Sequence, residues 1–173
     1  MNIINTNINR IQLLSHLAPN GVGVELGVFK GDYSKGILDH SSLKLLYSID
    51  RWAGDRGHDD NEYNLALSKL SPYKDRCIVK RATFEDSLLQ FKDEGLLFDF
   101  IYLDGYAHLG QGDLDHFFDW FELLKVGGIY AGHDYDKSFP SNIENVNSFF
   151  EKTSLPFFLT NEKVYPTWFT IKR

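Results

Sequence analysis

The sequence has 173 residues and a mass of 19.9 kDa, which fits one domain with a continuous core. It is 43% hydrophobic and 24% charged, an ordinary globular composition that excludes a disordered or collagen-like chain. The formal net charge of -6, without a dense basic patch, argues against a nucleic-acid partner.

Other features of the sequence limit the cellular compartments and partners that we expect for the protein. No apolar run reaches the roughly 20 residues that a membrane-spanning helix needs, and the first residues show no secretory signal. The single cysteine, Cys77, cannot form an internal disulfide or a cysteine-based zinc site. We therefore expect a cytoplasmic protein that contacts no membrane and whose partner is a small molecule.

The first half of the chain alternates between helical and strand patterns. Apolar residues at a spacing near three or four predict helices, and short continuous apolar runs predict buried strands. In chain order we expect a helix within residues 1–20, a strand at 22–26, a helix through Tyr33 and Ile37, a strand at 43–49, a helix at 60–70, a strand at 77–79 and a helix that begins after Thr83.

The alternation continues in the second half. We expect a strand at 98–103, a helix at 114–124 that ends at Gly127 and Gly128, a strand at 129–132, a helix from Ser141, and two final strands at 157–159 and 168–171. The last two apolar runs are separated by only a few residues, so they are expected to pair antiparallel at an edge of the sheet.

Five strand–helix repeats followed by a hairpin predict an α/β fold. We expect a Rossmann-like, doubly wound, mostly parallel sheet of seven strands, with helices on both faces and a C-terminal antiparallel hairpin. The whole chain, 1–173, is interpreted as a single domain. It divides into an N-terminal helix at 1–20, a core at 22–135, and a C-terminal helix and hairpin at 141–173.

Most of the predicted strands end in residues that can carry chemistry. The residues at or directly after the strand ends are Glu25, Asp50, Asp104 and the pair His133 and Asp134. Any one of these acids can be a loop-starting residue without further meaning. Ligands of open parallel sheets, however, bind outside the carboxyl ends of the strands, so the recurrence of acids at this edge predicts a ligand site there.

The turn after the first strand of the core carries Gly27 and Gly31. Glycine lets the backbone take a positive φ and approach a ligand closely, and the following helix presents free N–H groups to the same space. A dinucleotide fingerprint would need three glycines after the strand, but Gly21 and Gly23 lie before or inside it. The glycine spacing of this turn therefore argues against a site for a nicotinamide cofactor.

These motifs, in their order and spacing, resemble those of class I S-adenosylmethionine-dependent methyltransferases. Glu25-Leu26-Gly27 with Gly31-Asp32-Tyr33-Ser34 is similar to their first motif, and Tyr47-Ser48-Ile49-Asp50 is similar to their second. Residues 98–105 and 123–135 are similar to the regions of the fourth and fifth strands. The branch that the sequence resembles most is that of small O-methyltransferases of the catechol and macrocin type.

The resemblance implies a cofactor, S-adenosylmethionine, and a role for each matching residue. Glu25, Gly27 and Gly31 would hold its methionine end, with Ser34 near the carboxylate, and Asp50 would bind the ribose. Thr83 and Phe84 would meet the adenine, although Thr83 is as readily explained as a helix N-cap and Phe84 as core packing. Asp104 would lie beside the cofactor as well as beside the acceptor.

On the acceptor side the resemblance implies a divalent metal, Mg²⁺ or Mn²⁺, held by Asp104, His133 and Asp134. His133 stands where the metal-dependent relatives usually have an acid, which shifts the preference toward borderline metals. His133 is alternatively a metal-free general base or a structural histidine. The relatives' lysine base is replaced by Ala107, and the neighbouring His108 is a second candidate base or an exposed loop residue.

The resulting prediction is a methyltransferase that O-methylates a hydroxyl on a small molecule or sugar. The alternative is a non-catalytic cofactor-binding or scaffold protein of the same fold, and a nicotinamide-linked oxidoreductase is disfavoured by the glycine pattern. The loop at 53–61 is a candidate lid or a plain connection, and His58 within it is expected to be solvated. The small size of the chain favours an open pocket or one completed by a second copy in a homodimer.

Overall fold

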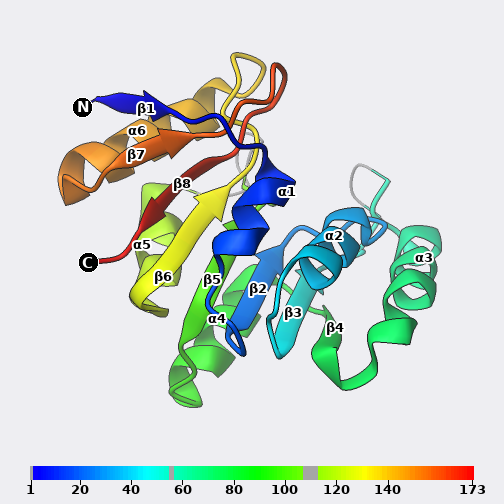
Figure 1. The fold of residues 1–173 in the computed structure, drawn as a ribbon. Coiled ribbons are helices and arrows are strands. Elements are labelled where there is room, and N and C mark those ends of the chain that lie inside the picture. The colour runs from blue at the N-terminus through cyan, green and yellow to red at the C-terminus, as the bar shows by residue number, and fades with distance from the viewer. Residues whose placement is uncertain (1, 55–56, 107–112) are drawn as a thin grey trace.

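The computed structural model describes residues 2–54, 57–106 and 113–173. Its strands form one sheet of eight, in the order β1-β7-β8-β6-β5-β2-β3-β4 (Figure 1). The strands are β1 (Ile3–Asn5), β2 (Val22–Leu26), β3 (Leu45–Asp50), β4 (Cys77–Arg81), β5 (Phe98–Leu103), β6 (Leu124–Gly132), β7 (Phe157–Leu159) and β8 (Trp168–Ile171). The helices are α1 (Arg10–Leu13), α2 (Asp32–His40), α3 (Asp60–Leu70), α4 (Phe84–Asp93), α5 (Leu114–Glu122) and α6 (Pro140–Thr153), with 3-10 turns at Leu14–His16 and Ser71–Arg76.

The sheet is mostly parallel, as the sequence predicts. Strands β4, β3, β2, β5 and β6 run parallel to one another, and β8 is antiparallel to both β6 and β7. The Rossmann-like fold with a C-terminal antiparallel hairpin is therefore confirmed. No helix among the described residues is long and apolar enough to cross a membrane.

The N-terminus departs from the prediction. Residues 3–5 form an eighth strand that pairs parallel with β7, so the hairpin does not lie at the sheet edge. This strand is held by backbone pairing with Phe157–Leu159, and its three residues carry too little hydrophobic pattern to be recognised. The expected N-terminal helix is only Arg10–Leu13, continued by the 3-10 turn Leu14–His16.

The connection between α5 and β6 also differs from the prediction. The helix ends at Glu122, and Gly127 and Gly128 lie inside β6, where the pairing with β5 is irregular. The Lys172 ammonium donates to the carbonyl oxygens of Phe121 and Leu124, at 2.8 and 2.7 Å, and so binds the end of the helix in place of a glycine cap. That lysine is distant in sequence, which explains the misplaced boundary.

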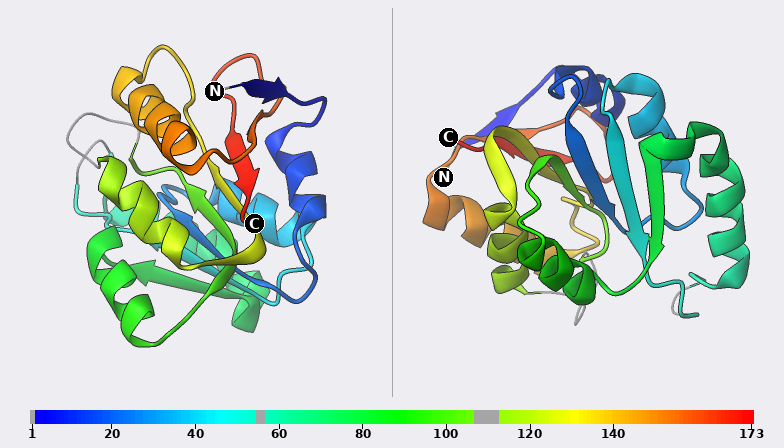
Figure 2. Two further views of the ribbon diagram at one scale, coloured as in Figure 1. Left: turned by 90° about the vertical axis from the view of Figure 1, so that its left-hand side faces the viewer. Right: turned by 90° about the horizontal axis from the view of Figure 1, so that it is seen from below.

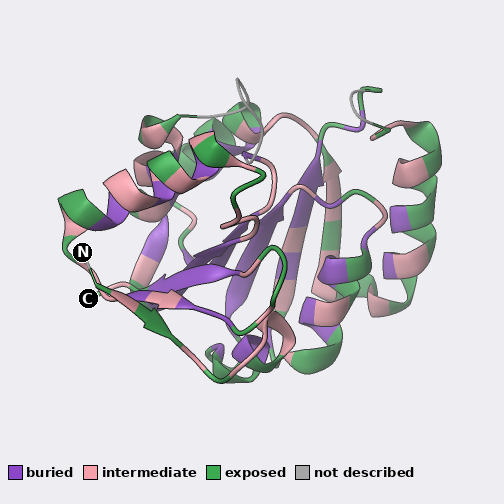
Figure 3. Cartoon of the chain, turned by 90° about the horizontal axis from the view of Figure 1, so that it is seen from above, coloured by how far each residue is buried: buried purple, intermediate pink, exposed green. Residues whose placement is uncertain are grey.

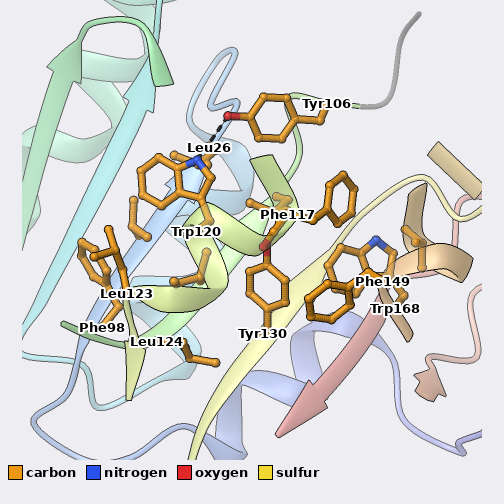
Figure 4. Close-up of a cluster of buried hydrophobic side chains, with 14 of the residues drawn as sticks. Leu26, Phe98, Tyr106, Phe117, Trp120, Leu123, Leu124, Tyr130, Phe149 and Trp168 are labelled. Carbon is orange, nitrogen blue, oxygen red and sulfur yellow. Dashed lines mark hydrogen bonds between the residues drawn. The ribbon is translucent and has the colours of Figure 1, made fainter. Parts of the chain in front are cut away.

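Helices cover both faces of the sheet (Figures 2 and 3). Buried side chains of α4, α5 and α6 share one core with Ile101 and Leu103 of β5, and those of α1 and α2 share another with Phe100 and Tyr102. This division follows from the alternation of side chains along a strand. Figure 4 shows the aromatic part of the first core, where the Trp120 indole N–H donates to the Tyr106 hydroxyl at 3.2 Å.

The register of the sheet brings the strand ends together. Leu26 at the end of β2 is paired with Leu103 of β5 and with Ile49 of β3, and Leu103 is paired with Gly132 of β6. The residues that follow these positions therefore emerge at one edge. Every strand-end candidate from the sequence belongs to this carboxyl edge of the sheet.

Candidate functional site

The turn after β2 requires glycine at Gly27. Its φ is +97°, and a Cβ atom there would lie 2.5 Å from the Asp104 carbonyl oxygen. Gly31, with φ +79°, is the N-cap residue of α2, so the free N–H groups of that helix face the same edge. The two predicted glycines thus let the turn lie directly against the end of β5, with an amide-rich helix terminus beside it.

Glu25 lies inside the layer between the sheet and α2. It is 1% exposed, and its carboxyl group accepts a hydrogen bond from the fully buried Ser34 hydroxyl, which also contacts the Ser48 hydroxyl at 2.8 Å. Burial raises the pKa of Glu25 to about 8, although the hydrogen bond from Ser34 opposes this shift. Both residues lie next to the glycine turn, and their contact with the cofactor stays a prediction.

Asp50 accepts hydrogen bonds from several donors at the end of β3. The backbone N–H groups of Val28 and Phe29 donate to Oδ2 at 3.0 Å, and that of Trp52 donates to Oδ1 at 3.1 Å. The His58 Nδ1 atom lies 2.8 Å from Oδ2. Burial favours the neutral acid, but the contacts with His58 and the amides outweigh it and lower the Asp50 pKa.

The expectation of a solvated His58 is wrong. Its ring contacts Asp50 and lies 4.8 Å from the Phe29 ring, so a residue of the loop at 53–61 covers the ribose-binding candidate. Phe29 and Trp52 have φ values of +52° and +42°, which are strained for residues other than glycine. Trp52 itself is buried, and its indole N–H donates to the Phe29 carbonyl oxygen at 2.8 Å.

Thr83 and Phe84 begin α4 at the same edge. The Thr83 hydroxyl accepts from the Asp86 N–H at 3.0 Å, so this residue is the N-cap of the helix. The Phe84 ring packs edge-on against Tyr106 and lies over Gly105, where a Cβ atom would be 2.2 Å from it. Thr83 is therefore a helix N-cap and Phe84 packs against other side chains, as the structural alternatives state. Contact of either residue with adenine stays a prediction.

The second group of candidates meets at the ends of β5 and β6. The His133 Nδ1 atom lies 2.9 Å from a carboxylate oxygen of Asp134 and 3.3 Å from one of Asp104. One ligand atom from each of the three residues can be chosen so that all lie within 4.8 Å of one another. The structure therefore brings together the three predicted metal ligands, while His108 lies outside the described residues.

The backbone of this second group is held by α6. The Asn142 side-chain amide donates to the carbonyl oxygens of His133, at 3.1 Å, and Asp134, at 2.9 Å. Asp134 has φ +58°, another left-handed conformation that non-glycine residues rarely adopt. Asn142 was not among the sequence candidates, because nothing in a helical asparagine indicates that it binds a strand end.

Arg10 of α1 is a further residue that sequence reasoning missed. Its guanidinium Nη1 lies 3.1 Å from His133 Nε2, and its Cζ lies 4.8 Å from the centre of the Tyr33 ring. Burial disfavours the charge on Arg10, but the neighbouring Tyr102, Tyr33 and Asp104 outweigh it and raise the Arg10 pKa. A half-buried, permanently charged guanidinium therefore borders His133 and Asp104.

The charges of this cluster depend on one another. Burial lowers the His133 pKa, but Asp104 and Asp134 outweigh it and raise that pKa to about 9. Burial is also the main reason why the Asp104 pKa is raised. The imidazolium form has no lone pair on Nε2 and cannot accept from Arg10, so the two carboxylates and the guanidinium favour different forms of His133.

The residues present fit an adenosylmethionine cofactor better than a metal. Gly27 and the α2 N-terminus form a turn that a ligand can approach closely, beside the Asp50 carboxylate. Asp50 Oδ1 accepts from the Trp52 N–H and, like any carboxylate oxygen, has two lone pairs. A metal on His133 Nδ1 would leave the proton on Nε2, where it would face the N–H donors of Arg10. The arrangement with Arg10 in place therefore does not fit a metal.

The comparisons with known proteins agree with this fold. A family model described as a methyltransferase domain matches residues 24–135, more than half of the chain. No curated protein matches the sequence significantly. Among solved structures, the O-methyltransferase from Bacillus cereus in complex with S-adenosylhomocysteine has a TM-score of 0.70 at 18% identity, covering 94% of this chain and 79% of that one.

Two further solved structures show how widely the fold is shared. The precorrin-6y C5,15-methyltransferase from Geobacter metallireducens has a TM-score of 0.68 at 11% identity, covering 94% of this chain and 86% of that one. A protein from Streptococcus mutans assigned as a methyltransferase, in complex with S-adenosylhomocysteine, has a TM-score of 0.66 at 14% identity, with coverages of 96% and 99%. The chain belongs to the methyltransferase domain family and has the fold of class I S-adenosylmethionine-dependent methyltransferases.

Proposed function

We propose that this protein uses S-adenosylmethionine to O-methylate a hydroxyl group on a small molecule or sugar. The observation that carries the proposal is the direct contact between two sets of residues at one sheet edge. The glycine turn after β2 approaches the Asp104 carbonyl so closely that a Cβ atom would lie 2.5 Å from it. A cofactor on that turn would have its reactive end beside the acidic cluster at the ends of β5 and β6.

The cofactor, when bound, supplies an electrophilic methyl group. The protein's own residues have the simpler tasks of binding and alignment, which are worth several kcal/mol in a bimolecular transfer. Asp50 is the acceptor for ribose hydroxyls, and the N–H groups at the start of α2 are donors for a carboxylate. The two halves of the site would thereby fix the distance from donor to acceptor.

An oxygen acceptor also has to lose a proton. Asp104 and Asp134 are the carboxylates nearest to that position, and the raised pKa of Asp104 makes it a stronger base than an ordinary aspartate. His133 Nδ1 contacts both carboxylates, and its Nε2 contacts Arg10. In this arrangement His133 orients the carboxylates and holds no free lone pair for the substrate.

The name of the Bacillus cereus structure supports an oxygen acceptor, and the precorrin methyltransferase shows that the fold is compatible with other acceptors. The proposal is tested by calorimetric titration with S-adenosylmethionine and S-adenosylhomocysteine, followed by S-adenosylhomocysteine release over a panel of phenols, catechols and sugars. Micromolar binding and release with at least one hydroxyl acceptor is expected. A folded sample that binds neither nucleoside contradicts the proposal.

A second candidate is a protein of this fold that does not catalyse the transfer. It is favoured by the state of Asp50, whose Oδ2 is shared by two backbone amides and His58, so the protein's own groups occupy the ribose-binding candidate. This alternative predicts either no cofactor binding or binding without methyl transfer to any acceptor. An amine or thiol panel run in parallel separates it from a methyltransferase that uses another acceptor.

A further inference from the structure

The chain fixes Arg10 at the acidic cluster through a series of contacts between its N-terminus and the C-terminal hairpin. The Thr6 N–H donates to the Leu159 carbonyl oxygen at 2.8 Å, and the Asn161 N–H donates to the Ile8 carbonyl oxygen at 3.0 Å. The Arg10 N–H then donates to a Glu162 carboxylate oxygen at 2.6 Å. The N-terminal segment therefore crosses the carboxyl edge of the sheet along a defined path, and α1 lies beside the end of β6 (Figure 1).

The start of α1 is defined as well. The Asn9 side chain accepts from the N–H groups of Ile11 and Gln12, at 3.0 and 2.8 Å, and the Gln12 side chain accepts from the Asn9 N–H at 2.9 Å. This reciprocal capping box fixes Arg10 as the first residue of the helix. Its guanidinium then lies over the Tyr33 ring, with Cζ 4.8 Å from the ring centre, and this contact restricts the side chain to a few rotamers.

The contact between Arg10 and His133 favours one position of the imidazole proton. A guanidinium has only N–H donors, so its 3.1 Å contact with Nε2 is a hydrogen bond only if Nε2 carries a lone pair. The proton of the neutral ring is then on Nδ1, which lies 2.9 Å from Asp134 and 3.3 Å from Asp104. In this tautomer the Arg10 guanidinium donates to His133 Nε2, and His133 Nδ1–H faces the carboxylates of Asp134 and Asp104.

We propose that Arg10 is the resident cation of the Asp104–His133–Asp134 cluster, where it holds His133 as the Nδ1–H tautomer and excludes a divalent metal. A metal bound between the carboxylates at Nδ1 would require the Nε2–H tautomer, which sets two N–H donors against each other at Arg10. The guanidinium supplies positive charge to the same carboxylates without an exchangeable ion. The inference rests on the proposed function only in taking this cluster as the acceptor side.

The first test measures Mn²⁺ binding by electron paramagnetic resonance in purified wild-type protein and in Arg10→Met. Arg81→Met is the matched control, because Arg81 also packs over a tyrosine ring and pairs with an aspartate, but at the end of β4. Arg10→Met is expected to bind Mn²⁺ at least about tenfold more tightly than wild type, a change of about 1.4 kcal/mol. Arg81→Met is expected to match wild type, and adding Asp134→Asn to Arg10→Met should abolish the gain.

The second test observes the tautomer of His133 in wild-type protein. Long-range ¹H–¹⁵N correlation spectra of wild-type protein report which ring nitrogen of His133 carries the proton, with His133→Gln used only for assignment. At pH 7 a protonated Nδ1 and an unprotonated Nε2 are expected, because the contact with Arg10 opposes the imidazolium that the two carboxylates favour when they raise the His133 pKa to about 9. A ring that is protonated on both nitrogens at pH 7 overturns the proposal. The Nε2–H tautomer, tight Mn²⁺ binding by wild type, or equal Mn²⁺ affinity in wild type and Arg10→Met overturns the proposal.

Neither measurement uses S-adenosylmethionine or turnover. A protein without methyltransferase activity can still show the Arg10-held tautomer, and an active enzyme can still prove to bind Mn²⁺ at this cluster. Failure of the inference and failure of the proposed function are therefore distinguishable.

Discussion

The two halves of the carboxyl edge use the same pair of residue types in different ways. At the end of β3, Asp50 contacts His58 at 2.8 Å, and at the ends of β5 and β6, Asp104 and Asp134 contact His133 at 3.3 and 2.9 Å. The Asp50 carboxylate is held mainly by backbone N–H groups of nearby turns. The second cluster is instead held by the side chains of Arg10 and Asn142, from α1 and α6.

From this difference we infer different tasks for the two halves. A carboxylate surrounded by backbone donors is rigid and keeps a low pKa, which suits the binding of neutral hydroxyl groups. A carboxylate that is buried beside a second carboxylate has a raised pKa, which suits the removal of a proton. We therefore expect substitutions in the two halves to separate cofactor affinity from turnover.

The largest effect is expected from Asp134→Ala. Removing this carboxylate takes away a candidate base and a partner of His133, so turnover should fall by about 10²- to 10⁴-fold, the range of general-base catalysis. Affinity for S-adenosylhomocysteine should change by less than about twofold, because Asp134 lies on the acceptor half. Initial rates and calorimetry on the same preparation check both numbers. A parallel loss of nucleoside affinity would show that the two halves are not separable.

Asp50→Asn is expected to have the opposite profile. Replacing a charged acceptor of ribose hydroxyls by an amide removes charge-assisted hydrogen bonds worth about 1.5–3 kcal/mol each, so S-adenosylhomocysteine affinity should fall by about 100-fold. The amide oxygen can still accept from one of the backbone donors, which makes this variant gentler on the fold than alanine. Thermal unfolding without ligand is the control, and unchanged affinity in a folded variant would remove Asp50 from the cofactor site.

His58→Ala tests whether the protein's own histidine competes with the cofactor. If His58 has to leave Asp50 before ribose binds, removing one hydrogen bond of about 1 kcal/mol should raise S-adenosylhomocysteine affinity by about fivefold. His16→Ala is the matched control, because His16 is an exposed histidine at the end of the N-terminal 3-10 turn. A loss of affinity in His58→Ala would instead make His58 a contact of the bound nucleoside.

The same contrast explains what the sequence can predict. The strands, the parallel order and the strand-end acids follow from local apolar runs and from the rule that such sheets bind ligands at one edge. Trp52 and His58 lie two and eight positions after Asp50, and Val28 and Phe29 belong to the glycine turn 22 and 21 positions before it. Both the turn and Asp50 are predicted at this edge from the sequence, so that half is largely visible, although the contact of His58 with Asp50 was not predicted.

The other half depends on residues that are distant in sequence. Arg10 and His133 are 123 positions apart, and β1, which leads toward Arg10, is held by backbone pairing with β7. Backbone pairing and long-range side-chain contacts leave no periodic signal in either segment. Only the topology, with β6 next to β8 and the hairpin next to β1, brings these segments together.

The smallest effect on the site is expected from Glu25→Gln. With a pKa of about 8, the Glu25 carboxyl group is mostly neutral at pH 7, so an amide of the same shape should change S-adenosylhomocysteine affinity by less than about threefold. Its effect on stability should depend on pH. The native-state pKa lies above the ordinary value of 4.5, so the native protein binds more protons than the unfolded chain between these two values.

The contribution of Glu25 to the free energy of unfolding is therefore fully present below about pH 4.5 and is lost as the pH rises through about 8. Glu25→Gln should remove this decline, so the variant gains stability relative to wild type between pH 5 and pH 9, as measured by urea unfolding at several pH values. Glu151→Gln, on the exposed face of α6, is the control that should leave the profile unchanged. Parallel pH profiles for wild type and Glu25→Gln would mean that the buried carboxyl group is ionised, and its hydrogen bond from Ser34 would then be the charge-assisted contact that keeps it so.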